Sequence, residues 1–103
     1  MIPRTPMTDK DTALRQAHAL AAARYPGEGS RLDKGLLIAL NGGALLLADG
    51  SAQVRSDRDA EIFYEVRHGR CDCPDSHNAP GFRCKHVYGV ALLRMALTLI
   101  ALG

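Results

Sequence analysis

Residues 70–89 read RCDCPDSHNAPGFRCKHVYG, and this stretch contains all three cysteines of the 103-residue chain. The cysteines and one histidine form two close pairs, Cys71-x-Cys73 and Cys84-x-His86, with ten residues between them. Two such pairs of thiolate and imidazole donors suit a tetrahedral metal ion, and structural zinc sites use four protein ligands of this kind. We therefore predict one structural Zn²⁺ held by Cys71, Cys73, Cys84 and His86.

Other uses of these cysteines fit the sequence less well. A redox site typically has Cys-x-x-Cys near a βαβ unit, whereas this chain has Cys-x-Cys and no βαβ pattern. His77, which lies between the two pairs, is an alternative ligand that would replace one of the four, while His18 and His68 are expected to have no metal role. The sequence has no phosphate loop, no serine–histidine–acid set and no paired carboxylates, so we predict no enzymatic activity and no small-molecule substrate.

The sequence before the motif has the period of β-strands. Ala44 to Ala48 is a short apolar run, Asp49-Gly50 is a turn signal, and Ser51 to Ser56 alternates between apolar and polar residues. Glu61 to Arg67 alternates in the same way, and the chain then turns into the cysteine stretch. These patterns predict a three-stranded antiparallel meander.

Helical patterns occupy both ends of the chain. An alanine-rich first helix is expected from Asp9 to Arg24, after an imperfect capping box in which Thr8 is followed by Asp11. Leu32, Leu36 and Leu40 favour a second helix over residues 31–40, with Ser30 as its cap. The alternative for residues 35–40 is a strand that turns through Asn41-Gly42. His86 to Leu102 predicts a final helix that only Gly89 weakens.

Together these elements predict an α+β fold in one domain, with a helical front end over residues 1–43 and a zinc-finger region over residues 44–103. Hydrophobic residues make up 47% of the chain and charged residues 23%, as in ordinary globular proteins. Met1 to Lys10 has no apolar core of a secretion signal, and the apolar run Met95 to Leu102 is shorter than the roughly 20 residues of a spanning helix. We therefore expect a cytoplasmic protein without a membrane partner, in a compartment that keeps thiols reduced.

The motif residues resemble a known family, the SWIM-type zinc finger. Cys71-Asp72-Cys73-Pro74-Asp75 is similar to the CxCPD opening of that finger, and Cys84-Lys85-His86-Val87 is similar to its CKH segment, which an apolar helix follows. The resemblance spans residues 44–93, and it implies a zinc-stabilised finger with Cys71, Cys73, Cys84 and His86 as ligands. It also implies binding to DNA or to a protein partner, because the finger is an accessory module of transposases, chromatin remodellers, recombination-associated proteins and kinases.

The charges around the motif permit a nucleic-acid partner without requiring one. The formal net charge of the chain is only +2. Residues 67–94 have a local positive excess, which three thiolates around one Zn²⁺ would reduce. The cations that we expect to contact a phosphate backbone or a protein partner are Arg67, Arg70, Arg83 and Lys85, with Arg55 and Arg58 extending the surface. The alternative is a solvated polar rim around the metal.

A protein-interaction module is the rival prediction. Residues 87–102 are apolar on nearly every side. One face of this helix can pack on the sheet and the first helix, and the remainder needs another cover. The sequence therefore predicts either a homodimer through residues 87–102 or burial of this helix within one chain.

Overall fold

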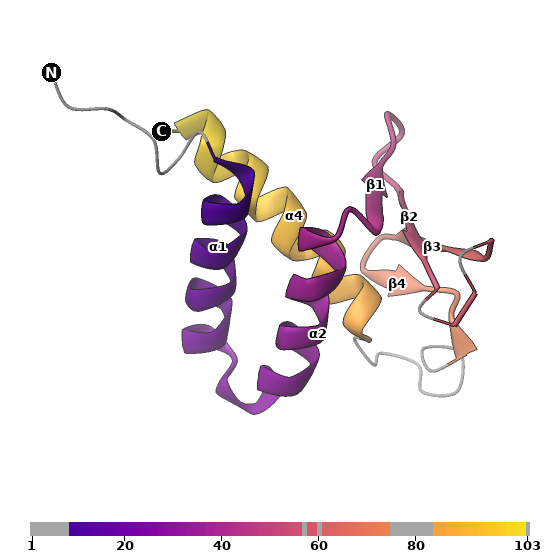
Figure 1. Ribbon diagram of the computed structural model, residues 1–103, viewed down its shortest axis with the longest axis horizontal. Helices are drawn as coiled ribbons and strands as arrows, with labels where there is room; N and C mark the ends of the chain where they lie inside the picture. Colours follow the sequence, from indigo (N-terminus) through magenta and orange to yellow (C-terminus); the bar gives the residue numbers. More distant parts are fainter. Residues whose placement is uncertain (1–8, 57, 60, 75–83, 103) are drawn as a thin grey trace, which may run out of the picture.

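Helices α1 and α2 pack against α4, and α4 also packs against an antiparallel sheet, so the predicted α+β class is confirmed (Figure 1). The computed structural model describes residues 9–56, 58–59, 61–74 and 84–102. In chain order the elements are α1 (Lys10–Arg24), the short 3₁₀ helix η2 (Pro26–Glu28), α2 (Gly29–Leu40), β1 (Ala44–Leu46), β2 (Ala52–Arg55), β3 (Phe63–Arg67), β4 (Arg70–Cys71) and α4 (Lys85–Leu102).

The sheet has four strands in the order β1-β2-β3-β4, one more than the predicted meander. The added strand comes from the turn at His68 and Gly69, which both have positive φ (55° and 74°). Positive φ at both residues of a two-residue turn matches the right-handed twist of a hairpin, so the pairing continues beyond the turn. As a result Cys71 lies opposite Val66 in the sheet.

The first two helices lie where the sequence predicts them, but neither begins with the predicted cap. Thr8, the predicted cap of the first helix, lies outside the described residues. Asp9 caps α1, because its carboxylate accepts hydrogen bonds from the Asp11 amide and the Thr12 hydroxyl (3.0 and 2.8 Å). Residues 31–40 are helical, as we favoured, but α2 already begins at Gly29, so Ser30 lies inside the helix and does not cap it. Helix α2 ends at Leu40, and Gly42 follows with a φ of 72°, which glycine adopts without strain.

Two hydrophobic clusters make up the core, and α4 contributes to both. One cluster lies between the helices, where small residues of α1, such as Ala17, pack with Leu32, Tyr88 and Leu92. The other lies between α4 and the sheet, where Val54 and Val66 pack with Val87, Val90 and the three cysteines. The inward faces of β2 and of the first half of α4 therefore define the surroundings of the cysteine pairs.

Helices α2 and α4 cross with their backbones close together. The crossing point is at Gly35 and Gly89, where a Cβ atom built on Gly35 would lie 2.8 Å from the Gly89 nitrogen. A Cβ on Gly89 would lie 3.2 Å from the Gly35 carbonyl oxygen. The glycine that weakens the last helix in the sequence pattern is therefore the residue that lets α2 approach it.

Among the described residues, α4 is also a candidate membrane span by length and composition alone. In this fold 44% of that span is buried, against α1, α2 and the sheet, and one such helix is weak evidence for a membrane span. The sequence-based expectation of no membrane partner stays a prediction.

Candidate metal centre

The β3–β4 hairpin and the start of α4 bring the two ligand pairs together. Cys71 is the last residue of β4, and Cys73 follows two residues later. Asp72, between them, is fixed to β3, because its carboxylate accepts a hydrogen bond from the Glu65 amide (2.9 Å) and its own amide donates to the Glu65 carbonyl (3.2 Å). Cys84 immediately precedes α4, and His86 lies in its first turn.

The four predicted ligands are buried as one cluster. Cys73, Cys84 and His86 have exposed fractions of 1%, 2% and 4%, and Cys71 of 7%. One ligand atom from each residue can be chosen so that all four lie within 4.8 Å of one another. The sequence-predicted set therefore meets at one place, with two ligands from the sheet side and two from the helix side.

Two distances within the cluster, those from the His86 imidazole, are close to an edge of a tetrahedral metal site. The Nδ1 atom of His86 lies 3.7 Å from Cys71 Sγ and 3.6 Å from Cys84 Sγ. With zinc–sulfur bonds of about 2.3 Å and zinc–nitrogen bonds of about 2.0 Å, a tetrahedral sulfur–nitrogen edge is about 3.5 Å long. The Nδ1 atom is therefore the ring nitrogen in position to bind a metal together with the sulfur atoms.

The surroundings of Cys71 favour its neutral thiol as long as no metal is bound. The neighbouring Cys84 thiol, followed by burial, raises the pKa of the Cys71 thiol, so crowding alone opposes its ionisation. A metal ion reverses this preference, because a coordinating thiol is deprotonated. None of the three cysteines is in a disulfide, and buried thiol and imidazole donors of this kind are the ligands that zinc selects.

The His86 ring packs against one aromatic side chain and has one nitrogen without a hydrogen-bond partner. The Tyr64 ring lies against the imidazole, with 5.1 Å between ring centroids and an angle of 48° between the planes. The Nε2 atom of His86 is buried and has no hydrogen-bond partner among the described residues. Tyr64 therefore packs against the ring, and the Nδ1 atom is the nitrogen that faces the sulfurs.

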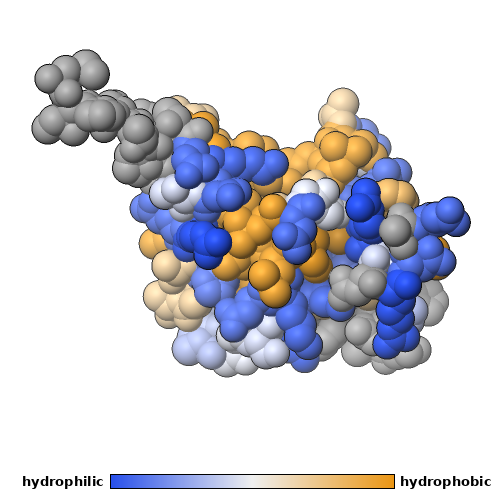
Figure 2. Space-filling model, viewed as in Figure 1, coloured by the Kyte–Doolittle hydropathy of each residue, from blue (hydrophilic) through white to orange (hydrophobic). Residues whose placement is uncertain are grey.

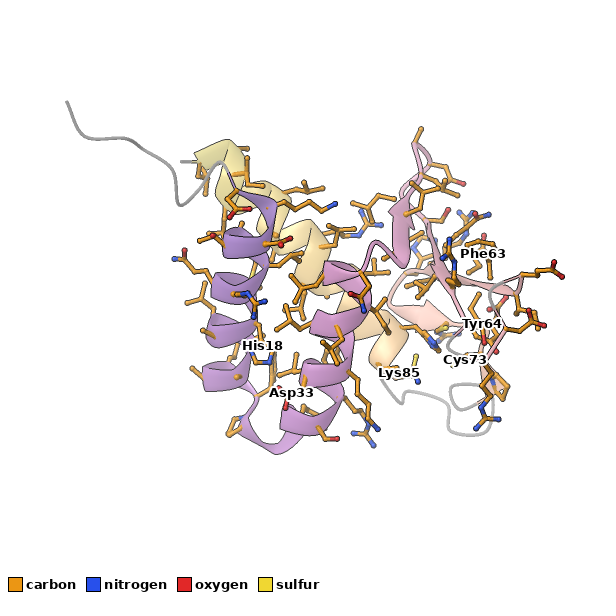
Figure 3. All side chains as sticks on the ribbon, in the orientation of Figure 1. His18, Asp33, Phe63, Tyr64, Cys73 and Lys85 are labelled. Atoms are coloured by element: carbon orange, nitrogen blue, oxygen red, sulfur yellow. The ribbon has the colours of Figure 1, made fainter. Side chains whose placement is uncertain are left out.

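The other histidines and the nearby acids do not join the cluster in the described structure. His18 Nε2 pairs with Asp33 Oδ1 across α1 and α2 (2.8 Å; Figure 3), and His68 is in the β3–β4 turn. The Asp72 carboxylate faces the Glu65 amide. The alternative ligand His77 lies outside the described residues.

The predicted contact residues have different surroundings. Arg67 lies on an exposed strand position, but its guanidinium is paired with Asp49 (3.0 Å) and Glu65 (3.3 Å), which raise its pKa. Arg70 is exposed opposite Arg67, and Lys85 lines two pockets, the smaller of which Cys73 and His86 also line. Arg83 lies outside the described residues.

Sequence reasoning missed Lys34, a cation of α2 that shares one of these pockets with Lys85. A lysine on the polar side of a helix gives no local sequence signal that it lines a pocket. Its position depends on the crossing of α2 and α4.

Comparison with known proteins finds no matching family model, no matching curated protein and no matching solved structure. The fold and the site define the class of this protein as an α+β domain with a Cys₃His cluster that is compatible with a bound metal.

Proposed function

We propose that this chain is a small SWIM-like binding module in which Cys71, Cys73, Cys84 and His86 hold one structural Zn²⁺, and that the cationic surface beside the metal binds nucleic acid. The observation that carries the proposal is the buried set of three thiols and one imidazole, whose ligand atoms lie within 4.8 Å of one another. Zinc fills such a site with protein ligands alone and supplies folding energy.

A structural role follows from the closed ligand set. Four protein donors leave a tetrahedral ion no open position for a substrate, so we propose binding and not catalysis. The ion would connect the β3–β4 hairpin to the start of α4, two segments that the sheet pairing does not join. Its contribution would be to hold the surface on both sides of the site in one arrangement.

The charges beside the metal cluster support a nucleic-acid partner. Arg58 and Lys85 line a pocket of about 110 Å³ together with Cys73 and His86, and no described carboxylate lines it. Arg70 adds an exposed cation on β4. Arg67 adds less, because Asp49 and Glu65 neutralise it. Such cations typically position a phosphate backbone without reading its sequence.

Two measurements test this proposal. The purified chain should contain one zinc per molecule by elemental analysis, and the zinc-loaded form should bind labelled DNA in fluorescence anisotropy at 50–300 mM salt. Affinity should fall with salt, with a slope that corresponds to several phosphates. A chain without zinc would contradict the metal role, and a zinc-loaded chain that does not bind DNA at low salt would contradict the nucleic-acid role.

Self-association is a second candidate, which a specific surface favours. Residues 86–90, 92, 93 and 96 of α4 are buried within the chain, so the homodimer predicted for residues 87–102 could use only the remaining positions. Met95 and Leu102 lie one heptad apart on the exposed side of α4, and Met95 lines a shallow apolar pocket with Leu20 and Tyr25 of the α1 region. Apolar side chains also gather at the surface between α1 and α2 (Figure 2).

This candidate is tested by the mass of the chain in solution. A dimer by light scattering should become a monomer in the double variant Leu20→Gln/Met95→Gln. The matched control is Leu45→Gln on β1, which removes an equally exposed leucine from the sheet (58% against 51% for Leu20). A monomeric parent at high micromolar concentration, or equal dissociation of the control, would contradict this candidate.

A further inference from the structure

A pocket of about 320 Å³ lies between α4 and the end of the sheet where the β1–β2 and β3–β4 turns meet. Its helix side is a single stripe of α4 at the spacing i, i+3, i+4 and i+7, made up of Val87, Val90, Ala91 and Arg94. Its sheet side consists of Gly50, Val66, His68 and Gly69. This pocket shares no lining residue with the two pockets that Lys85 lines.

The floor of this pocket is apolar and its rim is polar. Val66, Val87 and Val90 line it and are buried, whereas His68 and Arg94 are exposed. A ligand in the pocket would therefore meet hydrocarbon inside and two nitrogen-bearing side chains at the entrance.

The Arg94 guanidinium is held at this rim. Its Nη2 atom donates a hydrogen bond to the Gly50 carbonyl oxygen (2.6 Å), and Gly50 itself lines the pocket. A guanidinium has five N–H donors in a planar fork, so this bond fixes the group and leaves further donors for a ligand. Asp49, the acid that precedes Gly50, is already bound by Ser51 and Arg67. The rim therefore carries a positioned cation of the kind that binds carboxylates.

His68 brings an imidazole to the same rim from the β3–β4 turn. Its φ is 55° and that of Gly69 is 74°, and a turn of this kind favours asparagine or glycine at its first position. The turn itself therefore gives no reason for an imidazole here. An imidazole N–H beside a fixed guanidinium is a second donor for the same anion.

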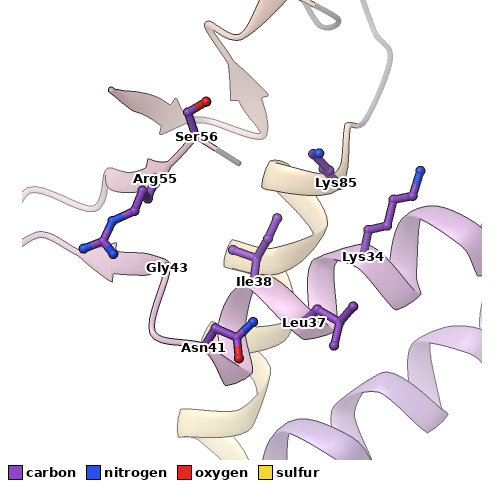
Figure 4. A pocket seen from close by; sticks show the side chains of 8 residues that line it. All are labelled: Lys34, Leu37, Ile38, Asn41, Gly43, Arg55, Ser56 and Lys85. Carbon is purple, nitrogen blue, oxygen red and sulfur yellow. The ribbon is translucent and has the colours of Figure 1, made fainter. Parts of the chain in front are cut away.

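The pocket of about 340 Å³ between α2 and β2 differs in this respect (Figure 4). Lys34, Arg55 and Lys85 line it, but the Arg55 guanidinium points away from the other lining residues. The position of Arg94, by contrast, is set by its hydrogen bond to a residue that lines its own pocket. The α4 pocket is therefore the one with a cation directed at its rim by a described contact.

We propose that the pocket between α4 and the two turns binds a small organic carboxylate, with its anionic group on Arg94 and His68 and a short apolar body against the valine side chains. A guanidinium fork matches a carboxylate through two parallel hydrogen bonds, and an apolar floor with few polar groups is typical of ligand pockets. A volume of about 320 Å³ is at the small end of such pockets, so a compound of the size of benzoate or hexanoate suits it. The compound would be a ligand and not a substrate, and the inference does not rest on the proposed nucleic-acid role.

Such a ligand would connect the same two segments as the metal. Val66 lies opposite Cys71 in the sheet, and Val87 follows His86 in α4. A compound held between these valines favours the arrangement in which the four metal ligands meet. By linkage, the bound carboxylate should therefore slow the release of zinc.

The test is a titration of the ¹⁵N-labelled, zinc-loaded chain, followed by its amide shifts in two-dimensional NMR. The probes are benzoate and hexanoate, compared with benzamide, which lacks the charge, and inorganic phosphate, which lacks the apolar body. The pocket variants are Arg94→Gln and His68→Asn, the second of which suits the turn. The control, Arg15→Gln, removes one charge from an exposed position on α1. Zinc content and thermal midpoint confirm that each variant is folded.

We expect benzoate and hexanoate to shift the amides of Gly50, Gly69 and Ala91 with a dissociation constant of about 1 mM. Arg94→Gln and His68→Asn should each weaken binding by about tenfold, because a hydrogen bond to a charged group is worth about that factor. Benzamide and phosphate should bind about tenfold more weakly than benzoate, and Arg15→Gln should keep the parent affinity. Benzoate at about ten times its dissociation constant should slow zinc release to a chelator by up to about tenfold.

Several results would overturn the inference. If neither carboxylate shifts the amides around the pocket, the site is wrong. If benzamide or phosphate binds as tightly as benzoate, the combination of charge and apolar body is wrong. If Arg94→Gln and His68→Asn both keep the parent affinity, or if Arg15→Gln loses as much as they do, the ligand is not held by this rim. If benzoate binds without slowing zinc release, the link to the metal site is wrong. Binding of DNA is not measured in this titration, so each outcome is separate from the test of the nucleic-acid role.

Discussion

Replacing Gly35 by alanine should destabilise the chain, although alanine is the better helix former. Gly35 lies in the middle of α2, where this exchange alone favours the helix by about 1 kcal/mol. The added Cβ would meet the Gly89 nitrogen at 2.8 Å, the Tyr88 Cβ at 3.0 Å and the Tyr88 carbonyl carbon at 3.1 Å. Two of these three atoms belong to the backbone of α4, so the clash cannot be relieved by a rotamer change.

The expected magnitude follows from these two opposing effects. Overpacking a well-filled site costs typically 1–3 kcal/mol, and a clash with a helix backbone belongs near the upper end, about 3 kcal/mol. After the gain in helix propensity, we expect a net loss of about 2 kcal/mol in the free energy of unfolding. For a chain of this size, that loss lowers Tm by roughly 10 °C.

The assay is denaturant and thermal unfolding at a fixed free zinc concentration, with two further glycine variants. Gly29→Ala is the matched control in the same helix, because a Cβ there would have no atom within 4 Å. Gly89→Ala should fall between the two, since its Cβ would lie 3.2 Å from the Gly35 carbonyl oxygen and 3.3 Å from the Ile38 Cγ2 atom. The expected order of stability is Gly29→Ala, then Gly89→Ala, then Gly35→Ala.

The same variants also report on the metal site. Gly89 lies one turn beyond His86 in α4, so a helix pushed away from α2 would also shift a ligand. We expect Gly35→Ala to release zinc to a chelator more readily than Gly29→Ala does. If Gly35→Ala were as stable as Gly29→Ala, the close backbone crossing would be refuted, and if it lost stability without any change in zinc release, the coupling between crossing and site would be refuted.

Three further perturbations follow from the structure. Zinc removal by a strong chelator, or Cys84→Ser, should abolish the cooperative unfolding transition, because zinc binding of about 10–16 kcal/mol in small fingers is as large as the whole stability of a typical domain, about 5–15 kcal/mol. Thr98→Ala on the same helix is the control, and an unchanged Tm without zinc would contradict the structural role. Tyr88→Phe should lower the free energy of unfolding by about 1–2 kcal/mol, since it removes the half-buried hydrogen bond from the Tyr88 hydroxyl to Glu28 Oε1 (2.8 Å). The control Tyr25→Phe removes an exposed hydroxyl and should change the free energy of unfolding by less than about 0.5 kcal/mol. Equal losses in the two variants would contradict the role of the Tyr88 hydrogen bond. Ser51 and Arg67 lower the pKa of Asp49 from 3.8 to about 2, so its carboxylate stabilises the β1–β2 turn above pH 3.8, and this contribution is lost as the pH falls to about 2. The denaturant midpoint of Asp49→Asn should therefore lie below that of the parent at pH 7 and approach it in acid. A difference that does not depend on pH would contradict the role of the charge.

Local patterns in the sequence account for much of the fold. The alternation of Ala52 and Val54 with polar neighbours predicts the buried face of β2, and both residues are fully buried. The spacing of the cysteines and His86 predicts the four residues that cluster, because two ligand pairs are a local signal. The helical period of residues 31–40 likewise favours the observed α2 over the competing strand.

The features that were missed depend on contacts between distant segments or on single backbone angles. Strand β4 exists because His68 adopts a positive φ, which is uncommon for a residue other than glycine and has no clear pattern in the sequence. Gly35 and Gly89 are 54 positions apart, and only the crossing of their helices gives each of them a packing role. Lys34 joins Arg55 and Lys85 through the same crossing.

Because α4 contributes to both hydrophobic clusters, the segment that carries the Cys₃His cluster depends on the helical front end for its packing. An excised segment that starts at residue 44 would carry Tyr88, Leu92 and Ala96 without α1 and α2, which bury them here. A front end without α4 would in turn leave Leu14, Ala17 and Leu32 uncovered. Grafting the metal site into another protein would therefore require transplanting the helical pair with it.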